Sequence, residues 1–144
     1  MKAIKPVTVT VHSVIDNFED GLPVGEPEIN TFSVPGSLAD DGERLTLRYG
    51  EDGEEGQHTD CLLCLTADGV MLTRRGSVVV DLLFAEGEEC HALYAVPPYK
   101  FDMTVRTRRI RRTLSYEGGE LQLIYSMNVG GQDKDVRMRI SVTP

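Results

Sequence analysis

The sequence predicts an all-β fold, a single antiparallel up-and-down β-barrel of about eight to ten strands over residues 1–144. Apolar and polar residues alternate from Val7 to Thr143, and side chains on a strand point to opposite faces with period two. Glycines and acidic turns interrupt this alternation at short intervals, and no long amphipathic helix is indicated. The apolar face must therefore pack against itself, which a closed barrel allows while it removes exposed strand edges.

The first half of the chain is expected to form three strands, at 7–15, 29–35 and 44–49. Two acidic segments rich in glycine lie between or after these strands, at 16–28 and 50–56. Glycine and acidic residues favour turns, so both segments are expected to be loops.

The second half is expected to form seven strands, at 58–67, 70–75, 77–85, 89–95, 101–114, 120–129 and 135–143. Asp68-Gly69 between the first two of these is a strong hairpin signal. In the strand at 101–114 the apolar parity changes partway along, which predicts a β-bulge near Arg108-Arg109. The last strand alternates most clearly, with four apolar residues on one face: Val136, Met138, Ile140 and Val142.

Composition limits the class of protein. A length of 144 residues suits one domain, and no apolar run is long enough to cross a membrane. Three cysteines and an N-terminus without a signal-peptide pattern predict a reduced, cytoplasmic location. A net charge of −8 makes general nucleic-acid binding unlikely by charge alone, with one local exception: Arg106, Arg108, Arg109, Arg111 and Arg112. The oligomeric state is left open.

Several short stretches occur in a recognisable order: Glu55-Gly56, 70–76, 83–87, Tyr94 with Pro97, 105–110, Gly118-Gly119 and 121–125. In order and spacing they resemble the YwiB-like family, small uncharacterised bacterial proteins with a calycin-like (lipocalin-related) barrel. The likeness covers roughly two thirds of the chain. It implies a fold but no reaction, so it assigns no catalytic residue.

The residue types that hold metals or act as nucleophiles are scattered. Cys61 and Cys64 form a C-x-x-C, but three positions along a strand place them on opposite faces, unlike a metal-binding turn. His12, His58 and His91 form a site only if their strands meet. No serine-nucleophile, phosphate-loop or dinucleotide pattern is present. We therefore expect no metal, no cofactor and no enzymatic activity.

Arg74 is the first candidate for ligand binding, because it shares a face with Val70 and Leu72. If that face is the barrel interior, the guanidinium needs an anionic partner. That partner is either an acid of the chain, such as Asp60 or Asp81, or the anionic group of a ligand. A binding protein for a small anionic molecule is the leading hypothesis, with four candidate lining residues: Arg74, Tyr49, Tyr94 and Tyr125.

A second hypothesis uses the outer face of the barrel. Arg106, Arg108, Arg137 and Arg139 are expected to share this face as a basic stripe. The stripe serves either as an interaction surface for a protein or nucleic acid, or as a solvated face paired with the acidic segments 16–28 and 51–55. The two hypotheses differ in where the arginines without acidic partners lie, inside a cavity or across the outer face.

Overall fold

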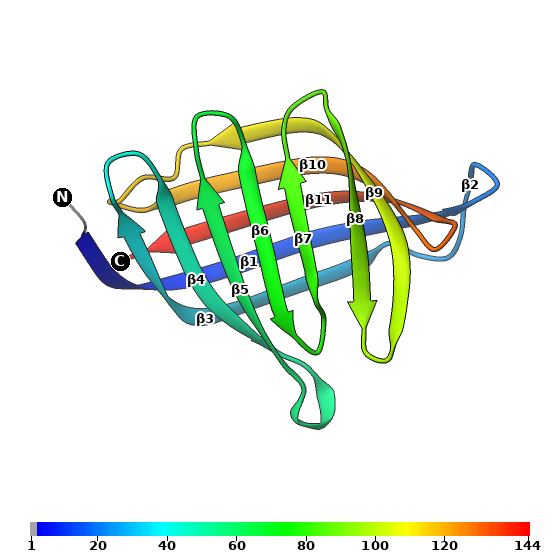
Figure 1. Cartoon of the computed structure of the whole chain (residues 1–144), viewed down its shortest axis with the longest axis horizontal. Helices are drawn as coiled ribbons and strands as arrows, with labels where there is room; N and C mark the ends of the chain where they lie inside the picture. The colour runs from blue at the N-terminus through cyan, green and yellow to red at the C-terminus, as the bar shows by residue number, and fades with distance from the viewer. Residues whose placement is uncertain (1–2) are drawn as a thin grey trace.

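The computed structural model describes residues 3–144, and its residues form one antiparallel sheet curled into a nearly closed barrel (Figure 1). A short 3₁₀ helix, η1 (Glu54–Gly56), lies between β4 and β5. The strands are β1 (Ala3–Glu19), β2 (Leu22–Pro23), β3 (Glu28–Asp40), β4 (Leu45–Asp52), β5 (His58–Leu65), β6 (Val70–Gly76), β7 (Val80–Phe84), β8 (Glu89–Val96), β9 (Tyr99–Arg112), β10 (Gly119–Val129) and β11 (Gln132–Thr143). The all-β prediction is confirmed.

The strands follow one another around the barrel in chain order, as an up-and-down meander requires. The order is β7-β6-β5-β4-β3-β1-β11-β10-β9-β8, and the short β2 pairs back onto β1. The first and last long strands are neighbours, since β1 pairs with β11 from Thr8 to Phe18. Between β7 and β8 the only bridge among the described residues is Val79 with Ala95, so the barrel closes through a seam.

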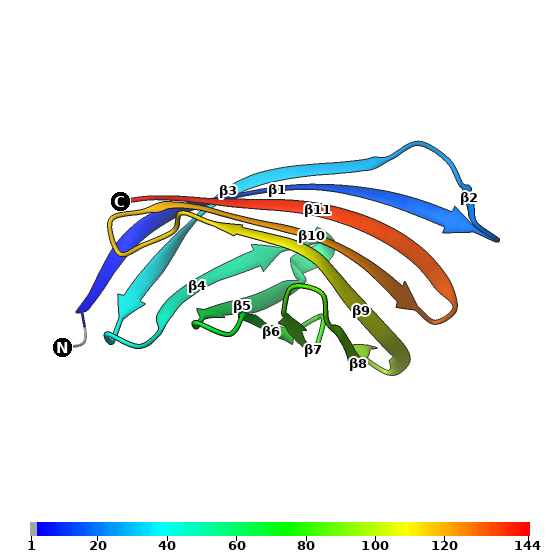
Figure 2. The same cartoon turned by 90° about the horizontal axis from the view of Figure 1, so that it is seen from above.

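Long and short strands form two facing walls. Figure 2 shows β1, β3, β10 and β11 along one side, with β4–β8 along the other. Five leucines lie in register across β3–β7 and face inward: Leu38, Leu47, Leu63, Leu72 and Leu82. With the aromatic pair Phe84 and Tyr125, whose ring centroids are 4.7 Å apart, they fill one end of the barrel. The hydrophobic core therefore occupies this end.

Strand pairing extends further than the sequence pattern predicts. β1 continues to Glu19 and pairs with β11 up to Phe18, although segment 16–28 was predicted to be a loop. β4 likewise runs to Asp52, inside the predicted loop 50–56. Much of the 16–28 segment is exposed to solvent. A strand with both faces exposed lacks the alternation of apolar and polar residues from which strands are predicted.

The bulge expected in β9 is confirmed. Ile124 of β10 pairs with Arg109, whereas the next residue, Tyr125, pairs with Thr107. Arg108 is the extra residue, and both it and Arg109 are exposed. The bulge explains the change of parity, because the inward positions are Met103, Val105 and Thr107 before it and Ile110 after it.

Candidate ligand cavity

The end of the barrel opposite the leucines is hollow. A cavity of about 800 Å³ lies between the two walls. Its lining residues lie toward the C-terminal ends of β1, β4, β6, β8 and β10 and toward the N-terminal ends of β3, β7, β9 and β11. Its walls are mainly apolar, including Phe32, Leu72, Leu82 and Phe101. Three methionines also line it, and their flexible thioethers fit irregular shapes: Met103, Met127 and Met138.

All four residues proposed from the sequence to line a ligand site do border this cavity: Tyr49, Arg74, Tyr94 and Tyr125. Arg74 and Tyr49 belong to the row immediately above the leucines. In that row Tyr49 of β4, Cys61 of β5 and Arg74 of β6 are in register. A row with polar side chains thus lies where the packed core meets the open cavity, and Leu72 and Leu82 of the core also line the cavity.

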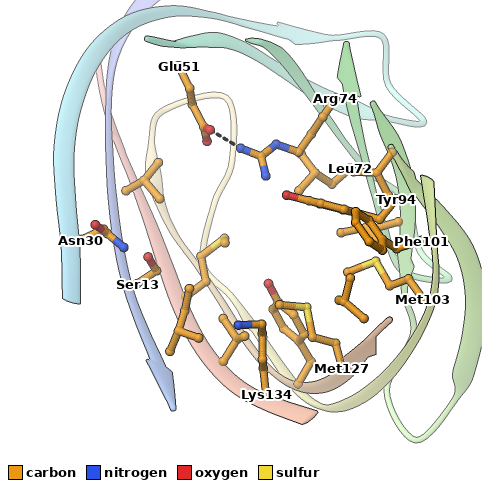
Figure 3. Close-up of a pocket in the computed structure, with 18 of the residues that line it drawn as sticks. Ser13, Asn30, Glu51, Leu72, Arg74, Tyr94, Phe101, Met103, Met127 and Lys134 are labelled. Atoms are coloured by element: carbon orange, nitrogen blue, oxygen red, sulfur yellow. Dashed lines mark hydrogen bonds and ion pairs between the residues drawn. The ribbon is translucent and has the colours of Figure 1, made fainter. Parts of the chain in front are cut away.

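The partner of Arg74 within the chain is Glu51, not Asp60 or Asp81 (Figure 3). An Nη atom of the guanidinium donates to the Glu51 carboxylate, and both side chains are about a quarter exposed, at 24% and 26%. Asp60 and Asp81 are both exposed on the outer face, where Asp81 bonds Arg75 at 2.9 Å. Both aspartates lie on the face of the sheet opposite to that of Arg74, since Asp60 pairs with Arg75 rather than with Arg74.

Arg74 retains one donor without an acceptor. Its Nε atom is buried and has no hydrogen-bond partner among the described residues. A buried N–H without an acceptor costs free energy comparable to a lost hydrogen bond. Arg74 lines the cavity, and residues 3–144 supply no acceptor for this donor.

A second cation, Lys134 of β11, was missed by the sequence analysis. It borders the cavity, and Figure 3 shows it on the wall opposite Arg74. Its ammonium donates to the amide oxygen of Asn17, a neutral group, and it has no carboxylate partner within residues 3–144. Its positive charge is therefore not matched by a nearby acid.

The missed lining residues carried a usable sequence signal. Glu51 continues the period-two series of Leu47 and Tyr49, and Lys134 precedes Val136 with the same parity. Ser13 and Asn30 extend the apolar series of β1 and β3 in the same way. Extending each inward series past its last apolar residue would have identified this polar rim.

Burial keeps the ionisable groups near Arg74 in their neutral or paired forms. Desolvation raises the pKa of the Cys61 thiol to about 11, with a further contribution from the Glu51 carboxylate. Desolvation likewise raises the pKa of Tyr49, and that of Tyr125 to about 12. Burial is the largest single influence on Arg74 and opposes its charge, but Glu51, Cys61 and Tyr49 together outweigh burial, so the pKa of Arg74 is also raised. The guanidinium and Glu51 are the charged species here, while the thiol and phenols are uncharged at neutral pH.

At the cavity rim His58 joins two strands. Its Nδ1 lies 2.7 Å from Asp52 of β4, and its Nε2 lies 2.9 Å from Asp60 of its own strand. Both ring nitrogens donate when the imidazole is protonated, and these bonds, led by that to Asp52, raise the pKa of His58. Asp52 also borders the cavity, so the bridge holds a segment of its mouth.

The remaining candidates for metal or redox chemistry are apart. Cys61 is buried, whereas Cys64 faces the opposite side of β5. His12 bonds Thr31 at 2.7 Å on the outside of β1, and His91 is exposed on β8. Within residues 3–144 no group of three or more His, Cys, Asp and Glu side chains is arranged to hold a metal ion.

The outer arginines differ from the predicted stripe in register. The bulge moves Arg109 and Arg111, rather than Arg106 and Arg108, into line with Arg137 and Arg139 across β10. Arg106 instead aligns with Ser126 and Asp135. The sequence pattern correctly placed all four predicted arginines on the exposed side, but an extra residue in β9 changes which of them are neighbours.

Comparison with known proteins places this barrel in a family. The family model described as Domain of unknown function (DUF1934) matches residues 14–140. The chain belongs to this family. The crystal structure of the YwiB protein from Bacillus subtilis is similar, with a TM-score of 0.80 and 22% sequence identity. That alignment covers 98% of this chain and 94% of YwiB, which confirms the YwiB-like resemblance and the barrel fold. No curated protein matches the chain.

The search for membrane-crossing helices is also negative. Over residues 3–144 no helix has the length and apolar character that a transmembrane helix requires.

Proposed function

We propose that this protein binds a small amphipathic molecule with an anionic group inside the barrel. The observation that carries the proposal is the buried Nε of Arg74, a donor without an acceptor in residues 3–144, beside a mainly apolar cavity. The volume of about 800 Å³ is in the range of small-molecule sites, which are mostly apolar with a few placed polar groups.

The charge distribution favours an anion. Glu51 pairs with Arg74, and Asp52 at the mouth pairs with His58, so Lys134 is the one charged lining side chain of residues 3–144 without an ion-pair partner. An anionic group of the ligand would neutralise Lys134, a second acceptor on the ligand would bond Arg74 on the opposite wall, and an apolar body would contact the leucines and methionines. A cationic or purely apolar ligand satisfies neither group.

We propose binding without catalysis. The nucleophile types beside Arg74 are the Cys61 thiol and the Tyr49 phenol, and the pKa of each is raised. A thiol with a pKa of about 11 is almost entirely protonated at neutral pH, and the thiolate is the reactive form.

The experiment compares three ligands with the same chain: dodecanoate, dodecanol and dodecyltrimethylammonium. Each is tested for displacement of the dye 1-anilinonaphthalene-8-sulfonate and for its effect on the melting temperature. We expect dodecanoate to displace the dye and raise the melting temperature most, and the ammonium compound least. If the three compounds act alike, the anionic preference is wrong, and if none acts, the binding proposal fails.

Variants locate the site. Lys134→Met removes the unmatched charge and is expected to abolish the advantage of dodecanoate over dodecanol. The matched control is Arg139→Met, which removes one positive charge from the exposed outer face and should leave the advantage intact. Loss of the advantage in both variants would indicate a nonspecific charge effect and contradict the cavity site.

A further inference from the structure

Four arginines form a compact group on the outer face of β9–β11, which we call the arginine square. Arg109 aligns with Arg137 through Ile124, and Arg111 aligns with Arg139 through Gln122. Positions two apart on a strand are separated by about 7 Å, and positions two strands apart by about 10 Å. All four side chains are exposed, and in Figure 2 no second layer covers β10 and β11 on their outer side.

The square has no acidic partners of its own. Of the outer arginines on β9 and β11, only Arg108 forms an ion pair within residues 3–144, with Asp135 at 3.5 Å. The acidic segments at 16–28 and 51–55, considered as partners from the sequence, make no ion pair with the square in that part of the chain. Four like charges this close repel one another, and an anionic partner would relieve that repulsion.

The local charge is opposite to that of the molecule. The chain carries a net charge of −8, so the square is a local cluster of positive charge on an acidic protein. Exposed charges more than about 10 Å away are largely screened at ordinary salt, so a bound anion would respond mainly to the square. A partner for this face is therefore a polyanion of limited width.

We infer that the arginine square binds the backbone phosphates of single-stranded nucleic acid. Every member is arginine, whose planar guanidinium bonds phosphate in a bidentate manner and also stacks on exposed bases. The rows of the square and the rows beside them also hold hydroxyl, amide and imidazole groups, including Gln122, Ser126 and His12, together with Ile124 and the acidic side chains of Glu120 and Asp135. The hydroxyl and amide groups are of types that commonly contact phosphate and sugar.

Two physical arguments favour a nucleic acid strand over an acidic polypeptide. Affinity for a polypeptide comes mainly from apolar or aromatic anchors in pockets, and the one apolar side chain between the arginines of the square is half-buried Ile124. Phosphate binding needs no such anchor, because counterion release drives it. A duplex is disfavoured because the flat sheet face presents no element to enter a groove.

The test measures fluorescence anisotropy of a labelled single-stranded RNA of mixed sequence, about 20 nucleotides long, with the full chain. Four neutralised phosphates predict a slope of log affinity against log salt of about −2.8, or a loss of about 50-fold between 50 and 200 mM salt. The double variant Arg137→Gln/Arg139→Gln should reduce the slope to about −1.4. Its melting curve verifies that the fold is kept.

The matched control is Arg48→Gln/Arg75→Gln, which also removes two positive charges, but from the outer face of β4–β6. We expect the control to bind RNA with the slope of the unaltered protein. Absence of binding at low salt, or equal slopes for both double variants, would overturn the inference. Equal competition by poly-glutamate would also overturn it and assign the face to an acidic polypeptide. None of these outcomes bears on the cavity, because the cavity test depends on Lys134 and on dodecyl ligands and uses Arg139 only as a surface control.

Discussion

At the scale of single residues, the ion pair of Arg74 with Glu51 contributes to the stability of the fold. Arg74→Met leaves the Glu51 carboxylate without its partner, and we expect a loss of about 1–3 kcal/mol in the free energy of unfolding. The loss should stay below the ~3–5 kcal/mol of a fully buried pair, because both side chains retain about a quarter of their exposure, at 24% and 26%. Urea unfolding of the unliganded protein measures it.

A double-mutant cycle separates pairing from packing. Glu51→Gln/Arg74→Met removes both charges together, so it should recover at least half of the stability lost in Arg74→Met. Additive losses would show that the ion pair contributes nothing, and that the effect of Arg74→Met comes from its aliphatic stem.

His58 makes the stability of the cavity mouth dependent on pH. Hydrogen bonds to Asp52 first and then to Asp60 raise the pKa of His58 in the folded state above its ordinary value of 6.5. The folded protein therefore binds the proton more tightly than the unfolded chain, and this stabilisation is fully present below about pH 6.5 and lost as pH rises through the raised pKa. The melting temperature of His58→Gln should thus be lower than that of the unaltered protein at pH 6, and the difference should shrink as the pH rises to 9.

The control for this prediction is His91→Gln, which alters an exposed histidine on β8. Its melting temperature should differ from that of the unaltered protein by the same small amount throughout the range. A His58→Gln difference that grows with pH would show that the imidazolium bridge is absent.

Among elements, the row of leucines across β3–β7 defines the packed end of the barrel. Leu63 has no solvent exposure, and Leu63→Ala should cost about 2–5 kcal/mol because the surrounding strands cannot close the space. Met138 lines the cavity and already faces open volume, so Met138→Ala should cost less than half as much. Urea denaturation of the two variants makes the comparison, and equal losses would mean that the cavity end is packed in solution.

The bulge in β9 determines a surface rather than the core. Thr107 and Ile110 still point inward on either side of it, so the barrel interior is preserved. The extra residue, Arg108, shifts the outer face and brings Arg109 and Arg111 opposite Arg137 and Arg139. The parity change was readable from the sequence, but the pairing partners of each arginine were not.

At the scale of the whole molecule, the seam is the weak point of the barrel. β7 pairs with β6 and β8 pairs with β9, and one bridge joins β7 to β8 across the gap. Amide groups along the seam side of β7 and β8 should therefore exchange with deuterium faster than those of β10, which pairs on both sides. Hydrogen exchange followed by NMR tests this, and equal protection of β7 and β10 would indicate a fully closed barrel.

The sequence alone determined the fold class, the chain-order meander, the inward faces of the strands and the place of the bulge. Each follows from the local alternation of apolar and polar residues, because this alternation indicates which face of a strand is buried. It also selected Arg74 and three tyrosines that do line the cavity.

Only the tertiary structure decided the partners. Glu51 instead of Asp60 or Asp81, Lys134 on the opposite wall, and Arg109 instead of Arg106 beside Arg137 all depend on pairing between strands. The core and the cavity share the same inward parity, so alternation does not distinguish a packed end from a hollow one. That distinction is made by barrel closure, which sets how far apart the two walls lie and hence whether side chains meet across the interior.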